Sequence, residues 1–150
     1  MKTEAGAFLA LRQVLYHLYN EILDKVLKRY GMTQMELNIL LFLANNPQYD
    51  TAAEMVSICK LAKSQVSAAV ENLASRGYLR RELEGRRIHL YLEPAAEPVI
   101  ADGRQCRKTF SDVVLEGISQ EEREVLNHLL MRMEQNARAA EKKLSEGKEL

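Results

Sequence analysis

The alternation of apolar and polar residues predicts a chain that is mainly α-helical. Over residues 4–29, apolar side chains recur every three or four positions, which is the spacing of one face of a helix. The recurring residues are Phe8, Leu11, Leu15, Leu18, Ile22 and Val26. Similar spacing returns over residues 33–45 and 51–59, and Gly31 and Pro47 mark the ends of the first two segments. Each segment is therefore expected to form an amphipathic helix with one buried face.

Three helix starts carry the pattern of a capping box. In this pattern a Ser or Thr hydroxyl and a Glu carboxylate three residues later each accept a hydrogen bond from a free backbone N–H group of the other residue. The three pairs are Thr33–Glu36, Thr51–Glu54 and Ser119–Glu122. They predict helices that begin near residues 34, 52 and 120.

A helix, a stop and a hairpin are expected in succession between residues 63 and 92. The helix runs from Lys63 to about Arg76, and Gly77 ends it. Its inner stripe holds Val66, Ala69, Val70 and Leu73. Strands are expected over residues 78–81 and 87–92, because apolar and polar residues alternate in the second run. The connection, residues 82–85, is short, so the two strands form a hairpin.

Two long helices are expected in the last third of the chain. The first begins between Pro94 and Pro98 and ends near Gly117, although Gly103 inside it costs about 1 kcal/mol relative to Ala. Its inward-facing residues are expected to be Val99, Cys106, Phe110, Val113 and Val114. The final helix carries an approximate seven-residue repeat that suits packing against another long helix. That repeat consists of Leu126, Leu129, Met133, Ala137, Ala140 and Leu144.

Charge is concentrated in one region of a chain whose net charge is zero. From Lys60 to Leu92 there are seven basic and three acidic side chains, so this region carries +4 and the remainder carries −4. A local basic surface on an acidic frame is typical of a nucleic-acid-binding protein. No apolar run approaches the roughly 20 residues that span a bilayer, and the N-terminus lacks the pattern of a secretory signal. A cytoplasmic protein without a membrane partner is therefore expected.

Catalytic and metal chemistry find little support in the sequence. The three histidines, His17, His89 and His128, are far apart, and the two cysteines, Cys59 and Cys106, form no CxxC pair. Both thiols are expected to be reduced and mostly buried, with redox sensing as the alternative. No nucleophile motif, phosphate-binding glycine loop or paired acids were found. We expect no enzyme activity, no metal and no cofactor.

The order of elements, together with the stretch LAKSQVSAAVENLASRGYLRR and the pair Arg86–Arg87, resembles the MarR family of winged helix-turn-helix transcriptional regulators. The resemblance covers nearly the whole chain. It implies one MarR-like domain over residues 1–150, with a DNA-binding lobe at 33–92 and a helical dimerisation region at 1–30 and 95–150. The implied fold is a winged helix-turn-helix, mainly α with a small β-hairpin wing (α+β), and long dimerisation helices at both ends.

The resemblance also implies a function. A homodimer would bind double-stranded DNA, with the helix from Lys63 in the major groove and the wing in the neighbouring minor groove. The expected protein is a ligand-responsive repressor of a near-palindromic operator. The alternative is a winged-helix dimer that acts as a protein-interaction module, with weak or no DNA binding.

Ten residues are candidates for DNA contact. Lys63, Ser64, Gln65, Ser67 and Asn72 match family positions that face DNA, and Arg86 and Arg87 match the wing-tip arginines; Arg76, Arg80 and Arg81 complete the basic set. A Gln side chain can pair with adenine through two hydrogen bonds, and a narrow minor groove attracts arginine. The alternative roles are helix capping and a solvated strand edge.

The sequence departs from the family at the wing and at the recognition helix. Gly85 replaces the Asp that, in the family, commonly precedes the two arginines and helps to hold the wing arginine. Ala68 and Ala69 stand where many members carry a large polar side chain, so fewer base contacts are expected from that turn.

Four aromatic side chains on the first helix or at its end are candidates for binding a small aromatic or phenolic effector. They are Tyr16, His17, Tyr19 and Tyr30. The alternative is that these residues lie in a dimer interface with their polar groups satisfied.

Overall fold

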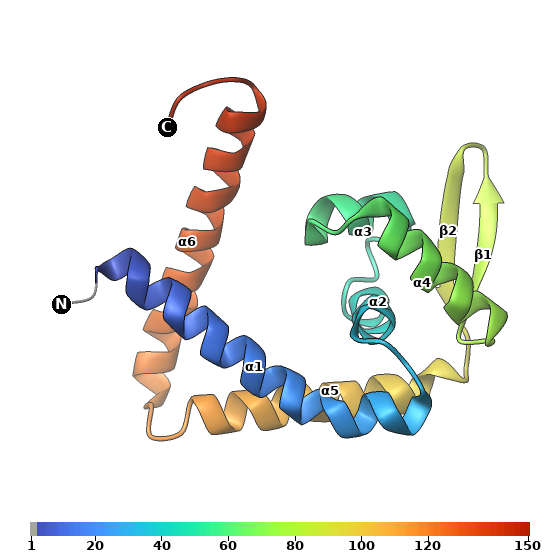
Figure 1. The fold of residues 1–150 in the computed structure, drawn as a ribbon, viewed down its shortest axis with the longest axis horizontal. Helices are drawn as coiled ribbons and strands as arrows, with labels where there is room; N and C mark the ends of the chain where they lie inside the picture. The colour runs from blue at the N-terminus through green and yellow to red at the C-terminus, as the bar shows by residue number, and fades with distance from the viewer. Residues whose placement is uncertain (1–2) are drawn as a thin grey trace. The chain divides into compact units, whose positions relative to one another are not determined.

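The computed structural model describes residues 3–150, which form six helices and one two-stranded antiparallel hairpin (Figure 1). The elements are α1 (Glu4–Tyr30), α2 (Gln34–Asn45), α3 (Ala52–Cys59), α4 (Lys63–Ser75), β1 (Leu79–Glu84), β2 (Arg87–Leu92), α5 (Ala96–Val114) and α6 (Gln120–Ser145). The mainly helical fold with a hairpin is as predicted. The chain divides into two compact units, Met1–Phe110 and Ser111–Leu150.

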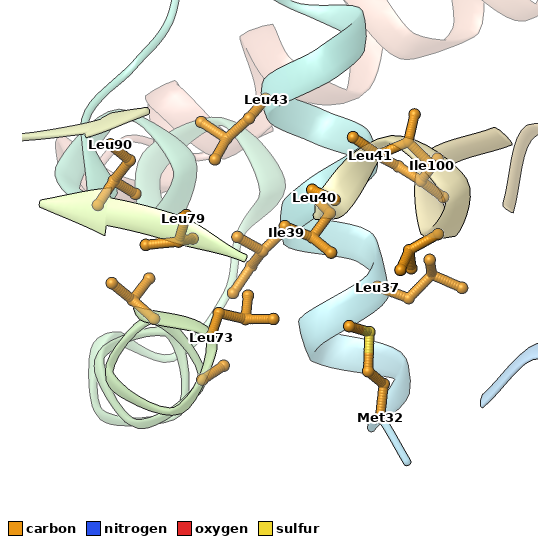
Figure 2. Close-up of a cluster of buried hydrophobic side chains, with 14 of the residues drawn as sticks. Met32, Leu37, Ile39, Leu40, Leu41, Leu43, Leu73, Leu79, Leu90 and Ile100 are labelled. Atoms are coloured by element: carbon orange, nitrogen blue, oxygen red, sulfur yellow. The ribbon is translucent and has the colours of Figure 1, made fainter. Parts of the chain in front are cut away.

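Helix α2 is the centre of the first unit. Leu37, Ile39, Leu40 and Leu41 are fully buried, and their side chains leave the helix on more than one side. Figure 2 shows Ile39 near Leu73 and Leu79, which belong to α4 and β1. On another side of α2, Leu37 and Leu41 face Ile100 of α5 (Figure 2). One core therefore joins the hairpin, α4 and α5 through α2.

Gly103 allows α5 to approach α2 closely. A Cβ atom at this position would lie 3.1 Å from methyl groups of Leu37 and Leu41, both of which are fully buried. Such a separation is shorter than normal van der Waals contact. Glycine is a poor helix former at this position, but it allows α5 and α2 to pack closely together.

The predicted stripe of α4 is confirmed, whereas the predicted hairpin was too short. Val66, Ala69, Val70 and Leu73 are the buried residues of α4. Strand β1 continues beyond Arg81 to Glu84, which pairs with Arg87 in the antiparallel register. Gly85, at φ 62°, and Arg86 then form a two-residue turn. Turns of this length require a left-handed residue, which glycine supplies without strain.

Two of the three predicted capping boxes are incomplete. Ser119 and Glu122 form the full reciprocal pair at the start of α6. Thr33 and Thr51 accept a hydrogen bond from the backbone three residues later, but the glutamate side chains do not return it. Glu36 is instead buried and accepts a hydrogen bond from Asn72. The carboxylate of Glu54 accepts a hydrogen bond from the Thr51 hydroxyl at 2.6 Å.

The apolar stripe of α1 is covered only in its second half. Leu23 and Val26 are buried, whereas Phe8 and Leu11 are more than half exposed. Leu23 lies outside the predicted stripe. The prediction that Val113 of α5 faces inward was wrong, because that residue is also more than half exposed.

Helix α6 contains no buried residue in the part of the chain that the structure describes. Within the unit Ser111–Leu150, the guanidinium of Arg123 donates hydrogen bonds to the carbonyls of Leu115 and Ile118, so the start of α6 is joined to the preceding turn. Farther along α6, Leu129 is 49% exposed and Met133 is 43% exposed. Its packing against another long helix remains a prediction.

Candidate nucleic-acid interface

The polar face of α4 is exposed where the helix begins. Lys63, Ser64, Gln65 and Ser67 all face solvent, on the opposite side from the buried stripe. Ala62 precedes the helix and makes no side-chain hydrogen bond to its first turn. The first backbone N–H groups therefore lack a side-chain acceptor, and they carry the partial positive charge of a helix N-terminus. This end of α4 can receive an anion.

A groove of about 660 Å³ lies between the start of α4, helix α3 and the turn of the wing (β1, β2 and their connection). Its basic lining residues are Lys63, Arg86 and Arg87. Within residues 3–150 these three side chains make no ion pair, so their charge is available to a ligand. The structure thus brings together the helix start and the wing tip that the sequence predicted as separate parts of one interface.

Arg80 is engaged inside the wing. Its guanidinium lies 4.6 Å from the centre of the Tyr91 ring, and it pairs with Glu82 at 3.3 Å and with Glu93 at 3.7 Å. Two carboxylates and an aromatic face therefore neutralise and orient this charge. Arg81 is also exposed, and it points to the other face of the hairpin because side chains alternate along a strand.

Asn72 and Arg76 direct their donors into the protein. The amide of Asn72 donates to Oε1 of Glu36 at 2.9 Å. The guanidinium of Arg76 donates to the carbonyls of Gly31 and Tyr30 at the end of α1. Both residues lie at the end of α4 opposite to Lys63. Unlike the three basic residues around the groove, both donate hydrogen bonds to partners within the protein.

His89 is a contributor to the wing that the sequence did not single out. Its Nδ1 lies 2.9 Å from Oδ1 of Asp50, and its Nε2 lies 3.2 Å from Oε2 of Glu84. The backbone N–H of Leu90 donates to the Asp50 carbonyl at 2.7 Å. The two contacts with Asp50 fasten the wing to the segment before α3. His89 thus connects the wing to the rest of the lobe. Asp50 is 39 residues away, so no local pattern could reveal the contact.

The four predicted effector residues do not form one site. Tyr16 and Tyr19 line a shallow groove of about 590 Å³ between α1 and α5, together with Arg12, Leu15, Arg107 and Phe110. Tyr19 packs edge-on against Phe110 with ring centres 5.4 Å apart, and its hydroxyl accepts a hydrogen bond from Nε of Arg107 at 3.2 Å. His17 is exposed on α1 and does not line this groove.

Tyr30 belongs to a different contact between α1 and α5. Its hydroxyl donates to Oδ2 of Asp102 at 2.7 Å, and Arg29 pairs with the same oxygen at 2.9 Å. The hydrogen bond to Asp102 raises the pKa of Tyr30 above its usual value. This tyrosine joins two helices, and a contact to a ligand is not needed to explain it.

The two cysteines differ in environment. Cys106 is buried, as predicted, and its Sγ lies 3.7 Å from the Ile22 carbonyl. Burial raises the pKa of the Cys106 thiol, which disfavours the reactive thiolate. Cys59 is exposed, so the prediction that it is buried was wrong. Among the residues that the structure describes, no three His, Cys, Asp or Glu side chains form a group able to hold a metal ion. No described helix is long and apolar enough to cross a membrane.

The family model described as MarR family matches residues 30–87, which cover the end of α1 through the start of β2. A MarR-family transcriptional regulator from Listeria monocytogenes, solved in complex with a 26mer DNA, is 16% identical with a TM-score of 0.80; the alignment covers 100% of this chain and 99% of that one.

Two further solved structures are similar over most of their length. A MarR protein from Peptoclostridium difficile is 20% identical with a TM-score of 0.82, and the alignment covers 96% of this chain and 95% of that one. The transcriptional regulator PA3341 is 26% identical with a TM-score of 0.75, and the alignment covers 88% of this chain and 98% of that one. The winged-helix architecture is therefore shared well beyond the segment that the family model matches.

Proposed function

We propose that this chain, which belongs to the MarR family, is a dimeric transcriptional regulator that binds duplex DNA. The observation that carries the proposal is the meeting of Lys63, Arg86 and Arg87 around one groove beside the exposed start of α4. Cationic side chains bind phosphates and release condensed counterions, and an α-helix fits the major groove of B-DNA. The basic groove and the helix together match a sugar-phosphate backbone next to a major groove.

In the proposed complex, the first turns of α4 enter the major groove. Gln65 is the side chain best suited to read a base, because its amide can pair with both hydrogen-bonding groups of an adenine edge. Ser64 and Ser67 are short, so they let the helix approach the phosphates. Arg86 and Arg87 at the wing turn contact phosphates or the adjacent minor groove. We leave Asn72, Arg76 and Arg80 out of the proposed contact set, because each already has a polar partner within the protein.

Dimerisation would place two such surfaces on one duplex. The exposed apolar side chains of α6, together with Phe8 and Leu11 of α1, support a second copy as the partner. Two-fold symmetry of the protein implies a near-palindromic operator with half-sites about one helical turn apart. Such binding would repress transcription by excluding polymerase. We place the protein in the cytoplasm and assign it no enzyme activity.

A small aromatic acid is the effector that the groove between α1 and α5 supports best. Tyr16, Tyr19 and Phe110 offer ring faces, and Arg12 and Arg107 offer guanidinium groups to a carboxylate. Benzoate is a suitable probe. It should release DNA from the wild-type protein and much less from Arg107→Ala, and equal release from both would refute this site.

The DNA-binding proposal is tested by replacing both wing-tip arginines with alanine. Affinity of Arg86→Ala/Arg87→Ala for a duplex selected from random DNA should be measured by fluorescence anisotropy at several salt concentrations. If both arginines contact phosphate in each protomer, the dimer loses four contacts, so the slope of log affinity against log salt should become shallower by about 3.6, since each contact contributes about 0.9. The matched control is Lys142→Ala/Lys143→Ala in the last turn of α6, which removes the same charge outside the groove and should leave the slope nearly unchanged.

The same titration separates this proposal from its rival. In the rival proposal, the chain is a winged-helix dimer whose basic face binds an acidic protein. Ala68 favours this rival, because it is exposed at a position where many family members carry a large polar side chain. If the wild-type chain binds no duplex even at low salt, DNA binding is refuted and the interaction module becomes the better explanation. An unchanged slope in the arginine variant would refute the wing contacts alone.

A further inference from the structure

We infer that Asn72, Arg76 and Glu36 form a positioning cluster that fixes the direction in which α4 meets DNA. This inference rests on the proposed function, and it assigns these residues a role distinct from DNA contact. The cluster connects the end of α4 to the end of α1 and the start of α2. None of the three residues lines the basic groove.

Arg76 completes the end of α1. The last carbonyls of a helix have no partner within the helix, and they carry its partial negative charge. Nη1 of Arg76 donates to the carbonyl of Gly31 at 2.9 Å, and Nη2 donates to the carbonyl of Tyr30. The residue that follows α4 is thereby joined to α1 by two directed hydrogen bonds. The guanidinium also lies over the ring of Tyr78, 5.2 Å from the ring centre. The residue just before β1 therefore also contacts Arg76.

Glu36 supplies the second attachment. Only 5% of this residue is exposed, and its Oε1 accepts the hydrogen bond from Asn72. Its Oε2 has no hydrogen-bond partner among the described residues, and it lies 3.8 Å from Nη1 of Arg76. A buried carboxylate requires a nearby positive charge or a proton to offset its lost hydration. Arg76 therefore interacts with the Glu36 carboxylate and with the carbonyls at the end of α1 at the same time. The planar guanidinium has several donors that can make these contacts together, whereas lysine has a single ammonium group.

These directed contacts complement the apolar packing of α4. Burial of Val66, Ala69, Val70 and Leu73 holds the helix against the core, but hydrophobic contact is non-directional and permits small rotations. Gln65 is about 16 Å from Arg76 along the helix, at 1.5 Å per residue. A tilt of about 10° at the anchored end would therefore move Gln65 by about 3 Å, which is a full hydrogen-bond length. Losing the cluster should therefore weaken recognition of a base without removing a phosphate contact.

The experiment compares Arg76→Ala and Arg76→Lys with the wild-type protein on a selected duplex and on a random duplex. Both titrations are run over a range of salt concentrations, at a temperature where circular dichroism shows every variant folded. We expect each variant to lose at least about tenfold in affinity for the selected duplex, to change less than about twofold on random DNA, and to keep the wild-type salt slope. Arg76→Lys keeps the charge, so its failure to rescue would identify the paired hydrogen bonds as the cause.

Two results would overturn the inference. A salt slope shallower by about two, one lost contact in each protomer, with similar losses on both duplexes, would make Arg76 a phosphate contact. If the Arg76 variants are less stable but bind both duplexes with unchanged affinity, the cluster contributes to stability and does not position α4 for DNA. Asn72→Ala is a milder variant for the case in which Arg76→Ala does not fold, and it should show the same selective loss. In a double-mutant cycle, Arg76→Ala and Glu36→Gln should be non-additive, because they act on one cluster.

Amide hydrogen exchange separates failure of this inference from failure of the proposed function. If the wild-type chain binds no duplex, DNA recognition is refuted, but the anchoring contacts can still be tested in the free protein. Arg76→Ala should accelerate exchange at the junction of α1 and α2 and at the end of α4, while core amides of α2 stay protected. Unchanged exchange at both places would show that the cluster does not hold α4.

Discussion

Helices α4 and α6 carry similar amphipathic patterns but use them differently. In α4, which has 13 residues, the apolar stripe is buried within its own chain. In α6, which has 26 residues, none of the side chains is buried in the described chain, and Leu129 and Met133 remain nearly half exposed. An amphipathic pattern therefore predicts that a face will be covered, but it does not identify what covers it.

The two helices also differ in how they can contribute to stability. Burial of α4 contributes to folding of a single chain, because its partners lie on α2 and the wing. If a second copy covers α6, its contribution depends on protein concentration. We therefore expect substitutions on the two apolar stripes to have different thermodynamic signatures.

The largest effect is expected from charges placed on the stripe of α6. Leu129→Asp/Met133→Asp should weaken the dimer by more than about 4 kcal/mol, roughly a thousandfold in Kd, because symmetry places each buried charge in the interface twice. Sedimentation equilibrium measures this change directly, and DNA affinity should fall with it. The control is Gln135→Asp, which adds a charge to an exposed position outside the stripe. A variant that remains dimeric would refute α6 as the dimer contact.

Shortening a side chain on the stripe of α4 should affect folding of the chain itself. Leu73 is fully buried, so Leu73→Ala should lower the free energy of unfolding by about 2–5 kcal/mol through lost burial and a new cavity. Urea denaturation at two protein concentrations measures both the size and the origin of the loss. The loss should be the same at both concentrations. A loss that grows on dilution would place Leu73 in an intermolecular contact and undo the distinction between the helices.

The smallest effect of the three concerns the polar side of α4. Gln65→Ala should cost about 1–3 kcal/mol on the selected duplex and less on random DNA, because the proposed base contact is lost while the charge of the protein is unchanged. Ser64→Ala is the matched control, since it alters a neighbouring exposed position that contributes no bidentate contact. Equal losses on selected and random duplexes would mean that Gln65 reads no base.

Local patterns predicted most of the fold. Helical spacing located α4 and its buried stripe, glycine marked the end of α1, and alternation located β2. These signals depend on residues a few positions apart, where the period of the backbone determines which side chains share a face. The extension of β1 to Glu84 was missed because polar residues on an exposed hairpin resemble a loop in the sequence.

The candidate interface was predicted less completely because it depends on distant contacts. Exposure of Lys63, Arg86 and Arg87 follows from the pattern, but their convergence around one groove requires the folded lobe. Glu36 and Asn72 are 36 residues apart, and the capping-box pattern suggested a different partner for Glu36. The same limit explains why the internal contacts of Arg76 were missed, since its carbonyl partners at the end of α1 are 45 and 46 residues away. Contact of Arg76 with DNA stays a prediction.

The central claim is that two copies of this chain bind one DNA duplex together. The most direct test is the composition of the complex with a duplex selected from random DNA. Sedimentation velocity with a labelled duplex, combined with hydroxyl-radical footprinting, measures the number of bound chains and their positions together. The expected result is two chains per duplex, with two protected half-sites about one helical turn apart. A single bound chain with one protected half-site, or no complex at low salt, would contradict the account.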